Sequence, residues 1–205
     1  MHKKYPVTEG DLVRMNVGQS FWGAKLEAIK DSCTYKAAVQ TWLSKMPEML
    51  KEGVGMLLHG ENRKGKTSAA VICMKAAATH GGTAYLIRAD AVAGATVERE
   101  MFDEYKTVIQ RCRTVDLLVI DELVHRAGRD QSTAMLEQLI RWRYDRKLSM
   151  IFTANTGLKG VEERYGVGLA MVVRSRCLPV EVTGTEWYDE EKRKVNDMFD
   201  RKVGE

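Results

Sequence analysis

Short apolar stretches alternate with longer amphipathic ones along most of this chain. Each apolar stretch has the length of a buried β-strand, and the segments between them carry apolar side chains at helical spacing, such as Ala38, Val39, Trp42 and Leu43. Strands that alternate with helices predict a parallel, doubly wound α/β sheet with helices on both faces. The five expected strands span residues 54–59, 83–88, 115–120, 149–154 and 177–183.

Proline and glycine mark where the expected helices end. Pro47 should end or kink a helix over 35–46, and Gly53 should stop whatever continues past it. Gly81–Gly82 are expected to close the helix that follows the first strand. Residues 1–20 are polar and are expected to be partly mobile. Further helices are expected over residues 66–79, 92–113, 132–147 and 186–201.

Composition narrows the class of protein. With 205 residues, 44% of them hydrophobic and 29% charged, the chain fits one soluble domain with a short extra segment. No apolar run approaches the ~20 residues of a membrane helix, and the polar N-terminus is unlike a secretory signal. The four cysteines stand far apart, which favours reduced thiols in a cytoplasmic protein. The net charge of +4 permits a nucleic-acid partner without requiring one.

A phosphate-binding loop is the strongest motif. The segment Gly60–Thr67 matches G-x-x-x-x-G-K-[ST] between an expected strand and an expected helix, which is the context that the motif requires. Backbone N–H groups of the loop would point at the phosphates, where the helix dipole also favours negative charge. Lys66 would reach the β- and γ-phosphates of ATP, and the Thr67 hydroxyl would bind Mg²⁺. The residues expected to hold the nucleotide are Gly60, Glu61, Asn62, Arg63, Lys64, Gly65, Lys66, Thr67 and Ser68.

Two other strands end in polar side chains that suit ATP hydrolysis. The strand over 115–120 leads into Asp121, which would hold Mg²⁺ directly or through water, and Glu122, which would deprotonate the attacking water. The strand over 149–154 leads into Asn155. If this strand lies between the other two, Asn155 would contact the γ-phosphate or the water. The alternatives are an ordinary loop for the Asp-Glu pair and a turn residue for Asn155.

These elements, in this order, resemble the AAA+ ATPases of the DnaC/IstB-like group, which includes phage and bacterial replicative-helicase loaders and transposition helper ATPases. The resemblance also rests on the helix over 136–144, on Thr153–Asn155 and on Val173–Cys177, and it covers roughly 17–185. It implies a P-loop NTPase three-layer sandwich around a parallel five-stranded sheet. It divides the chain into an N-terminal arm and helix leading into the adenine site (1–52), an ATPase core (53–185) and a C-terminal helix (186–205).

The resemblance assigns roles outside the loop as well. Arg176, with Arg174 as a second candidate, stands where the family carries the arginine finger that completes a neighbouring subunit's ATP site. Such a guanidinium stabilises transition-state charge, so the resemblance implies a homo-oligomer that forms with ATP. Phe21 and Trp22 stand in the family's lead-in to the adenine site, although aromatic residues that pin an N-terminal arm explain them equally well.

The sequence departs from the family pattern in two places. Arg63 stands where family loops carry glycine, and Lys64 stands where they carry a small residue. The loop is therefore expected either to bind nucleotide less tightly or to grip phosphate with two added cations. The expected place of a sensor-2 arginine, after Gly184, reads Thr185–Asp189 and contains no arginine.

Two basic clusters are candidates for contact with single-stranded DNA, which cations and stacked aromatic rings can bind. In the family, helices before the Asp-Glu strand make this contact, but acidic residues are interspersed here and a solvated helix face is the alternative. The first cluster comprises Arg88, Arg99, Phe102, Tyr105, Lys106, Arg111 and Arg113, and the second Arg141, Trp142, Arg143, Tyr144, Arg146 and Lys147.

The function implied is an ATP-hydrolysing AAA+ protein that acts on a DNA-replication partner such as a replicative helicase, with slow turnover stimulated by oligomerisation or DNA. A transposition helper is the alternative within the family. A P-loop nucleoside or nucleotide kinase is disfavoured by Glu122, by Asn155 and by the lack of an arginine-rich lid between strands. A nucleotide-switched binding module without turnover is suggested by Arg63 and the missing sensor-2 residue.

Overall fold

The computed structural model describes residues 6–92, 103–124, 131–184 and 196–198. Its centre is a five-stranded sheet in the order β2-β3-β4-β1-β5, in which every neighbouring pair is parallel. This arrangement confirms the predicted fold class, and it puts the carboxyl ends of all strands at one edge of the sheet. The strands are β1 (Gly55–His59), β2 (Ala84–Arg88), β3 (Leu117–Asp121), β4 (Ser149–Ala154) and β5 (Cys177–Glu181).

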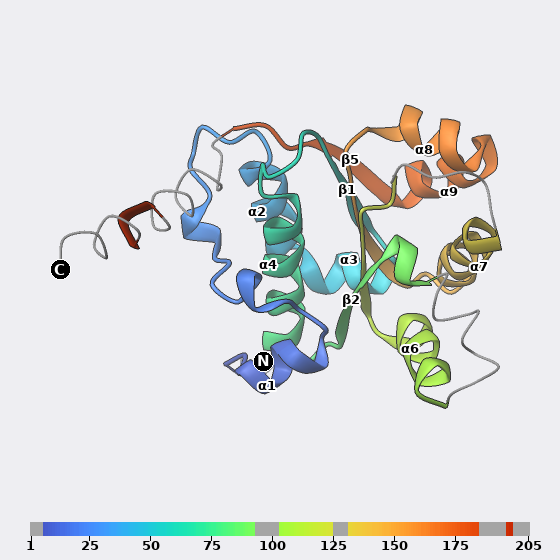
Figure 1. The fold of residues 1–205 in the computed structure, drawn as a ribbon, viewed down its shortest axis with the longest axis horizontal. Helices are drawn as coiled ribbons and strands as arrows, with labels where there is room; N and C mark the ends of the chain where they lie inside the picture. Colours follow the sequence, from blue (N-terminus) through green and yellow to red (C-terminus); the bar gives the residue numbers. More distant parts are fainter. Residues whose placement is uncertain (1–5, 93–102, 125–130, 185–195, 199–205) are drawn as a thin grey trace.

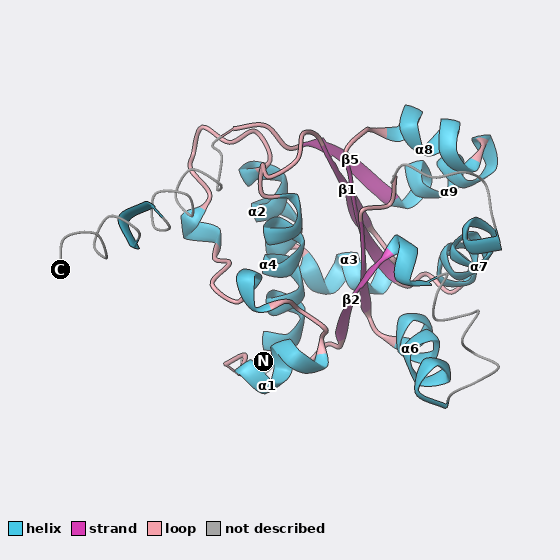
Figure 2. Ribbon diagram, viewed as in Figure 1, coloured by secondary structure: helices cyan, strands magenta, loops and turns pink. Residues whose placement is uncertain are grey.

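Helices cover both faces of the sheet and make three layers (Figure 1, Figure 2). Successive strand residues point to opposite faces, so Leu57 packs in one core cluster and Leu58 in the other, and both are fully buried. One face is covered by α2 (Lys36–Ser44), α3 (Met46–Glu52) and α4 (Lys66–Thr79), and the other by α6 (Asp103–Thr114), α7 (Gln131–Asp145), α8 (Leu158–Tyr165) and α9 (Val167–Arg176).

The breaks between elements confirm the interpretation of proline and glycine. Lys45 separates α2 from α3, and Pro47 lies in the first turn of α3, where a missing N–H leaves no hydrogen bond unmade. Gly53 then ends α3 in the left-handed conformation, with φ 68°. A Cβ atom at Gly53 would lie 2.6 Å from the backbone of Lys147, so only glycine fits there. The bounds of α4 are those predicted.

The described residues of the N-terminal arm pack against the rest of the protein, and their partial mobility stays a prediction. Its helix α1 (Glu9–Arg14) begins with a capping box, in which the Thr8 hydroxyl and the Asp11 carboxylate each accept from the other's backbone N–H. The carbonyl of Met15 accepts from Leu86 N–H at 2.9 Å, and Asn16 Nδ2 donates to Leu86 O at 2.8 Å. The arm therefore pairs with the outer edge of β2, which would otherwise be open.

Some predictions lie outside the described residues, and some elements were not predicted. The helix expected over 92–113 is described only at Val92 and from Asp103 onward, and the terminal helix over 186–201 only at 196–198. No helix in the described part is long and apolar enough to cross a membrane. All four cysteines are buried free thiols. The helices α1, α8 and α9 and the short 3-10 helices at Gln19–Phe21 and Leu26–Ala28 were not predicted.

Candidate nucleotide-binding site

The phosphate-binding loop connects β1 to α4 at the carboxyl edge of the sheet, as predicted. Gly60 has φ 137°, and a Cβ atom there would lie 2.7 Å from Val182 O. Gly65 precedes α4 with φ 96°. Arg63 also adopts a left-handed conformation, with φ 64°, at the position where the resemblance expects glycine. A non-glycine residue costs about 1–2 kcal/mol in that conformation, so the loop stores strain at Arg63.

Lys66 begins α4 and turns its ammonium group back into the loop. Only 8% of Lys66 is exposed, and Nζ donates to Gly60 O at 2.7 Å and to Glu61 O at 2.6 Å. Burial lowers the pKa of Lys66, while the charges of Asp121 and Glu122 oppose that shift. The direct acceptors of this buried ammonium are neutral carbonyls, so a phosphate group fits here as its anionic partner.

The side chains expected to hold Mg²⁺ meet next to the loop. Thr67 Oγ1 donates to Asp121 Oδ1 at 3.0 Å, across 54 residues of sequence. Hydroxyl and carboxylate oxygens suit Mg²⁺, which commonly binds one or two protein groups together with substrate phosphates and water. The described residues contain no cluster of three or more His, Cys, Asp or Glu side chains able to hold a metal. The donor set therefore fits a nucleotide-bound Mg²⁺ rather than a cage made by protein alone.

Glu122 follows β3 directly, but its carboxylate points toward a neighbouring strand. Glu122 has φ 56°, and its N–H donates to Thr153 Oγ1 at 3.0 Å. Arg88 Nη2, at the end of β2, lies 2.8 Å from Glu122 Oε2 and 2.9 Å from Asp90 Oδ2. The hydrogen bonds that Arg88 donates to the Asp90 carboxylate, followed by the charge of Glu122, raise the pKa of Arg88. Because β2 flanks β3 on the side away from β1, this ion pair turns the carboxylate away from the phosphate loop.

The strand that leads into Asn155 lies where the prediction for this residue requires it, between the strand before the phosphate loop and the strand of Asp121. Asn155 follows β4, which lies between β1 and β3 in the sheet. The residue is exposed at the carboxyl edge. In the same turn, Gly157 leaves room for the His59 ring, which an added Cβ atom would approach to 3.3 Å. Contact of Asn155 with phosphate or water stays a prediction.

The two arginine-finger candidates lie at the opposite end of the sheet. Both belong to the last turn of α9, immediately before β5 begins, so they are about one strand length from the loop. Arg176 Nη1 donates to Glu52 O at 3.0 Å, and its guanidinium lies 5.4 Å from the centroid of the Tyr144 ring. Arg174 is exposed. Neither residue can reach the loop of its own chain.

The second basic cluster is not a continuous surface, because Arg143 is fully buried. Arg141 pairs with Glu137 at 2.7 Å, whereas Arg146 lies over the Trp142 ring at 4.0 Å. In the first cluster, Arg113 also approaches the Trp142 ring, at 5.7 Å. Arg88 belongs to the Glu122 site described above, and Arg111 is exposed. Arg99 and Phe102 lie outside the described residues, as do the side chains of Tyr105 and Lys106.

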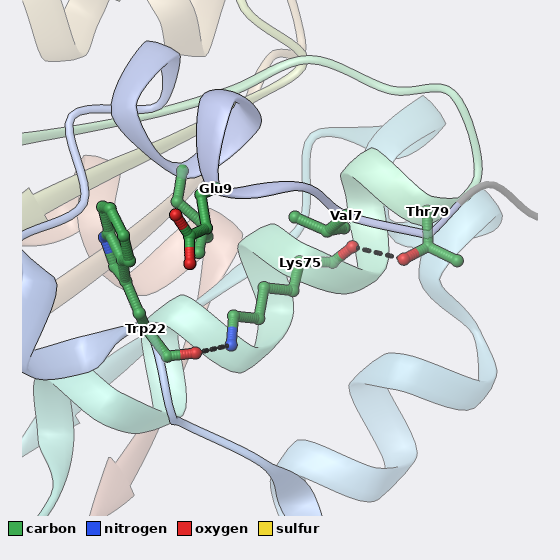
Figure 3. Close-up of a pocket in the computed structure, with 6 residues that line it drawn as sticks. Val7, Glu9, Trp22, Lys75 and Thr79 are labelled. Atoms are coloured by element: carbon green, nitrogen blue, oxygen red, sulfur yellow. Dashed lines mark hydrogen bonds between the residues drawn. The ribbon is translucent and has the colours of Figure 1, made fainter.

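Trp22 lines a cavity of about 390 Å³ at the C-terminal half of α4 (Figure 3). Its Nε1 donates to Val17 O at 2.9 Å, and its carbonyl and that of Ala24 accept from Lys75 Nζ. Lys75 lies about 13 Å along the helix from Lys66. These contacts pin the arm to α4, and Phe21 packs partly buried on the same core. A role of either ring in adenine binding stays a prediction.

Two side chains of the site were not assigned to it from the sequence. Arg88 ends β2 in register with Asp121 at the end of β3, so an alignment of strand ends could have placed it at this edge. Thr153 is a buried hydroxyl near the end of β4. The sequence feature that could have assigned Thr153 to the site is its single polar side chain between the apolar residues Phe152 and Ala154.

Known structures share this fold, although no family model and no curated protein matches the sequence. The chain is similar to the DnaC helicase loader, with 19% identity, a TM-score of 0.72, and coverage of 81% of this chain and 100% of that one. It is similar to DnaI, with 14% identity, a TM-score of 0.70, and coverage of 83% and 93%. It is also similar to the replication initiator DnaA bound to AMPPCP and single-stranded DNA, with 18% identity, a TM-score of 0.64, and coverage of 85% and 55%. The chain therefore has the P-loop NTPase fold of DnaC-like AAA+ proteins, as the resemblance implied.

Proposed function

We propose that this chain binds ATP with Mg²⁺ and hydrolyses it to ADP and phosphate. The proposal rests on the contact at 3.0 Å between Thr67 Oγ1 and Asp121 Oδ1, with Lys66 in the same loop and Glu122 next to Asp121. A hydroxyl, an ammonium and the Asp121 carboxylate then converge where the loop meets the sheet, and Glu122 follows Asp121 directly. The fold shared with a DnaA structure that holds AMPPCP supports the same conclusion.

Each group has a distinct task in this reaction. Lys66 and the loop N–H groups bind the phosphates, and Thr67 and Asp121 hold the ion. Mg²⁺, when bound, neutralises charge on the phosphate oxygens. Glu122 accepts a proton from the attacking water once its carboxylate leaves Arg88, and Asn155 orients that water or the γ-phosphate.

We infer that a second copy of the chain supplies the arginine finger. Val167 and Met171 are 58% and 65% exposed, and they share one face of α9 with Arg174 at helical spacing. An apolar strip that ends in a guanidinium suits packing against another subunit. Arg176, the first candidate, already donates to Glu52 O within its own chain, so we place Arg174 first.

We also propose that the oligomer acts in DNA replication, on single-stranded DNA and on a partner such as a replicative helicase. The fold that the chain shares with the DnaC helicase loader and with the replication initiator DnaA bound to single-stranded DNA supports this role. On the chain itself, Arg113 and Arg146 flank Trp142 at the ends of α6 and α7. Guanidinium groups beside an aromatic ring suit a single strand, through phosphate contact and base stacking.

Phosphate release from ATP tests the catalytic proposal. The wild-type chain with ATP and Mg²⁺ is expected to release phosphate slowly, and faster with a single-stranded oligodeoxynucleotide. Glu122→Gln is expected to bind ATP yet turn over at least about a hundredfold more slowly, because the general base is lost. Glu137→Gln makes the same chemical change on the surface of α7, so it should keep wild-type turnover.

The other outcomes separate the alternatives. Wild-type protein that binds no nucleotide contradicts the proposal as a whole. Binding without phosphate release favours the nucleotide-switched module. Phosphoryl transfer to added nucleosides or nucleotides favours a kinase.

A further inference from the structure

Thr153 is a buried hydroxyl group at the centre of the candidate site. It is 1% exposed and belongs to β4, the strand between β1 and β3. Its Oγ1 lies 2.5 Å from Asp121 Oδ1 and 3.0 Å from Glu122 N. One side-chain atom therefore contacts two consecutive residues that the proposed reaction needs.

Chemistry fixes the direction of both hydrogen bonds. An ionised carboxylate can only accept, so the Thr153 hydroxyl must donate its proton to Asp121. A backbone N–H can only donate, so the same oxygen must accept from Glu122. A hydroxyl is one of the few side-chain groups that can do both from a single atom. The isosteric methyl group of valine can do neither.

The two bonds act on the position of each partner. Asp121 Oδ1 accepts from Thr67 as well as from Thr153, so two hydroxyl groups fix the orientation of this carboxylate. Glu122 has φ 56°, a strained conformation for a residue with a side chain. The bond from its N–H to Thr153 Oγ1, followed by the bond from Leu123 N–H to Thr153 O at 2.8 Å, holds this turn against β4.

We propose that Thr153 is a positioning residue that sets the Mg²⁺-binding carboxylate of Asp121 and the turn carrying Glu122 through one hydroxyl group. The inference rests on the proposed function, since it assigns Thr153 to the same reaction. Thr153 does not touch the nucleotide in this role. It acts on the two carboxylate residues, so its loss should affect Mg²⁺ dependence and turnover more than binding of ATP itself.

Three variants test the proposal. Thr153→Val removes the hydroxyl and keeps the shape, and Thr153→Ser keeps the hydroxyl. Ser149→Ala is the matched control, because Ser149 is a fully buried hydroxyl at the other end of β4 that donates to Val54 O at 2.7 Å. Each variant is compared with wild type in thermal unfolding, ATP binding, Mg²⁺ half-saturation and turnover. The exchange rate of the Glu122 amide is measured by NMR on the nucleotide-free chain.

The expected result is specific to Thr153→Val. Its turnover falls at least about tenfold and its Mg²⁺ half-saturation rises several-fold, as is typical when a partner of a metal-binding carboxylate is lost. Its KM for ATP stays within about twofold of wild type, and the Glu122 amide exchanges about tenfold faster. Thr153→Ser keeps the wild-type turnover, Mg²⁺ half-saturation and Glu122 exchange rate. Ser149→Ala loses thermal stability but keeps the same three wild-type values.

Two results would overturn the assignment of Thr153. One is wild-type Mg²⁺ dependence, turnover and Glu122 exchange in Thr153→Val. The other is the same defect in Thr153→Ser, which would indicate that packing of the Thr153 methyl group, and not its hydroxyl, supports the reaction. Failure of the proposed function gives a different result, in which wild-type protein itself binds no ATP. The exchange rate of the Glu122 amide still tests the Thr153 contact in that case.

Discussion

At the scale of single residues, the ion pair between Arg88 and Glu122 bears most directly on activity. The pair forms because β2 and β3 are parallel and in register, with Arg88 opposite Asp121 and Glu122 one residue further on. Both side chains are about half exposed, so water screens their attraction. Such pairs contribute at most about 1 kcal/mol. Glu122 can therefore leave Arg88 at a modest cost when it is needed beside a nucleotide.

Replacing Arg88 by alanine is expected to increase the basal rate of phosphate release. The attraction of Arg88 that draws the Glu122 carboxylate toward β2 would be lost, and a pair of up to about 1 kcal/mol corresponds to a gain of up to about fivefold. Arg141→Ala breaks an exposed pair with Glu137 on α7 and should leave the rate unchanged. A lower rate in Arg88→Ala would mean that Arg88 assists the reaction instead of restraining Glu122.

At the scale of elements, Arg143 joins a helix to two strands. Its guanidinium donates to Cys112 O near the end of α6 and to Ser149 O at the start of β4, both at 2.8 Å. It also donates to Asp116 O, just before β3, at 3.4 Å. A cation near the last carbonyls of a helix also interacts favourably with the helix dipole. Burial lowers the pKa of Arg143 to about 10, so the side chain still carries its charge at neutral pH.

Replacing Arg143 by methionine should destabilise the fold by about 3 kcal/mol, because buried carbonyl oxygens of α6 and β4 would lose their donors. Urea unfolding followed by circular dichroism measures this change. Arg143→Lys should be intermediate, since one ammonium group cannot reach both carbonyl groups with the same geometry. Arg141→Met on the exposed face of the same helix serves as control. Equal stability of Arg143→Met and wild type would contradict a role of these bonds.

At the scale of the whole molecule, the two halves of the proposed catalytic machinery lie at opposite edges of one sheet. The loop and its carboxylates occupy the carboxyl edge, whereas Arg174 lies where α9 meets the start of β5. A rigid sheet cannot bring these edges together. For Arg174 to act on ATP held by a phosphate loop, as proposed, that loop must therefore belong to another copy of the chain.

Mixing two inactive variants tests this arrangement. Arg174→Ala keeps the loop and should lose at least about a thousandfold in turnover, as is typical when an arginine finger is removed. Lys66→Ala keeps the arginine and should lose nucleotide binding. Mixed subunits are expected to recover part of the wild-type turnover, because the Arg174 of one variant serves the intact loop of the other. Arg176→Ala, measured alongside, distinguishes the two candidates, and mixtures that stay inactive would contradict catalysis across subunits.

Patterns within short segments of the sequence predicted the helices and strands whose bounds are set by residues inside or next to them. The bounds of α4 and β4 were predicted to the residue, and the other four strands within two residues at either end, because apolar runs, Gly53 and the loop motif act over a few positions. The loop, Asp121 and Glu122 were found for the same reason. The helix α9 was missed because its apolar positions form no clear helical stripe, and α8 was missed because it is only eight residues long, although Leu158, Val161 and Tyr165 keep helical spacing. The packing of the arm was not predicted because it depends on the edge of β2, far along the chain.

The sequence alone determined that a P-loop stands before α4 and that two carboxylates stand at the end of an apolar strand, since each depends on spacing within one segment. The alternation of strands and helices along the chain also predicted the parallel sheet. Only the tertiary structure decided how charged and hydroxyl groups from different strands pair. It put Arg88 on Glu122, buried Arg143 beneath α6, and set Thr153 against Asp121 and Glu122. These contacts join residues more than 25 positions apart in the sequence, and the order β2-β3-β4-β1-β5 that brings their elements together arises only when the sheet assembles.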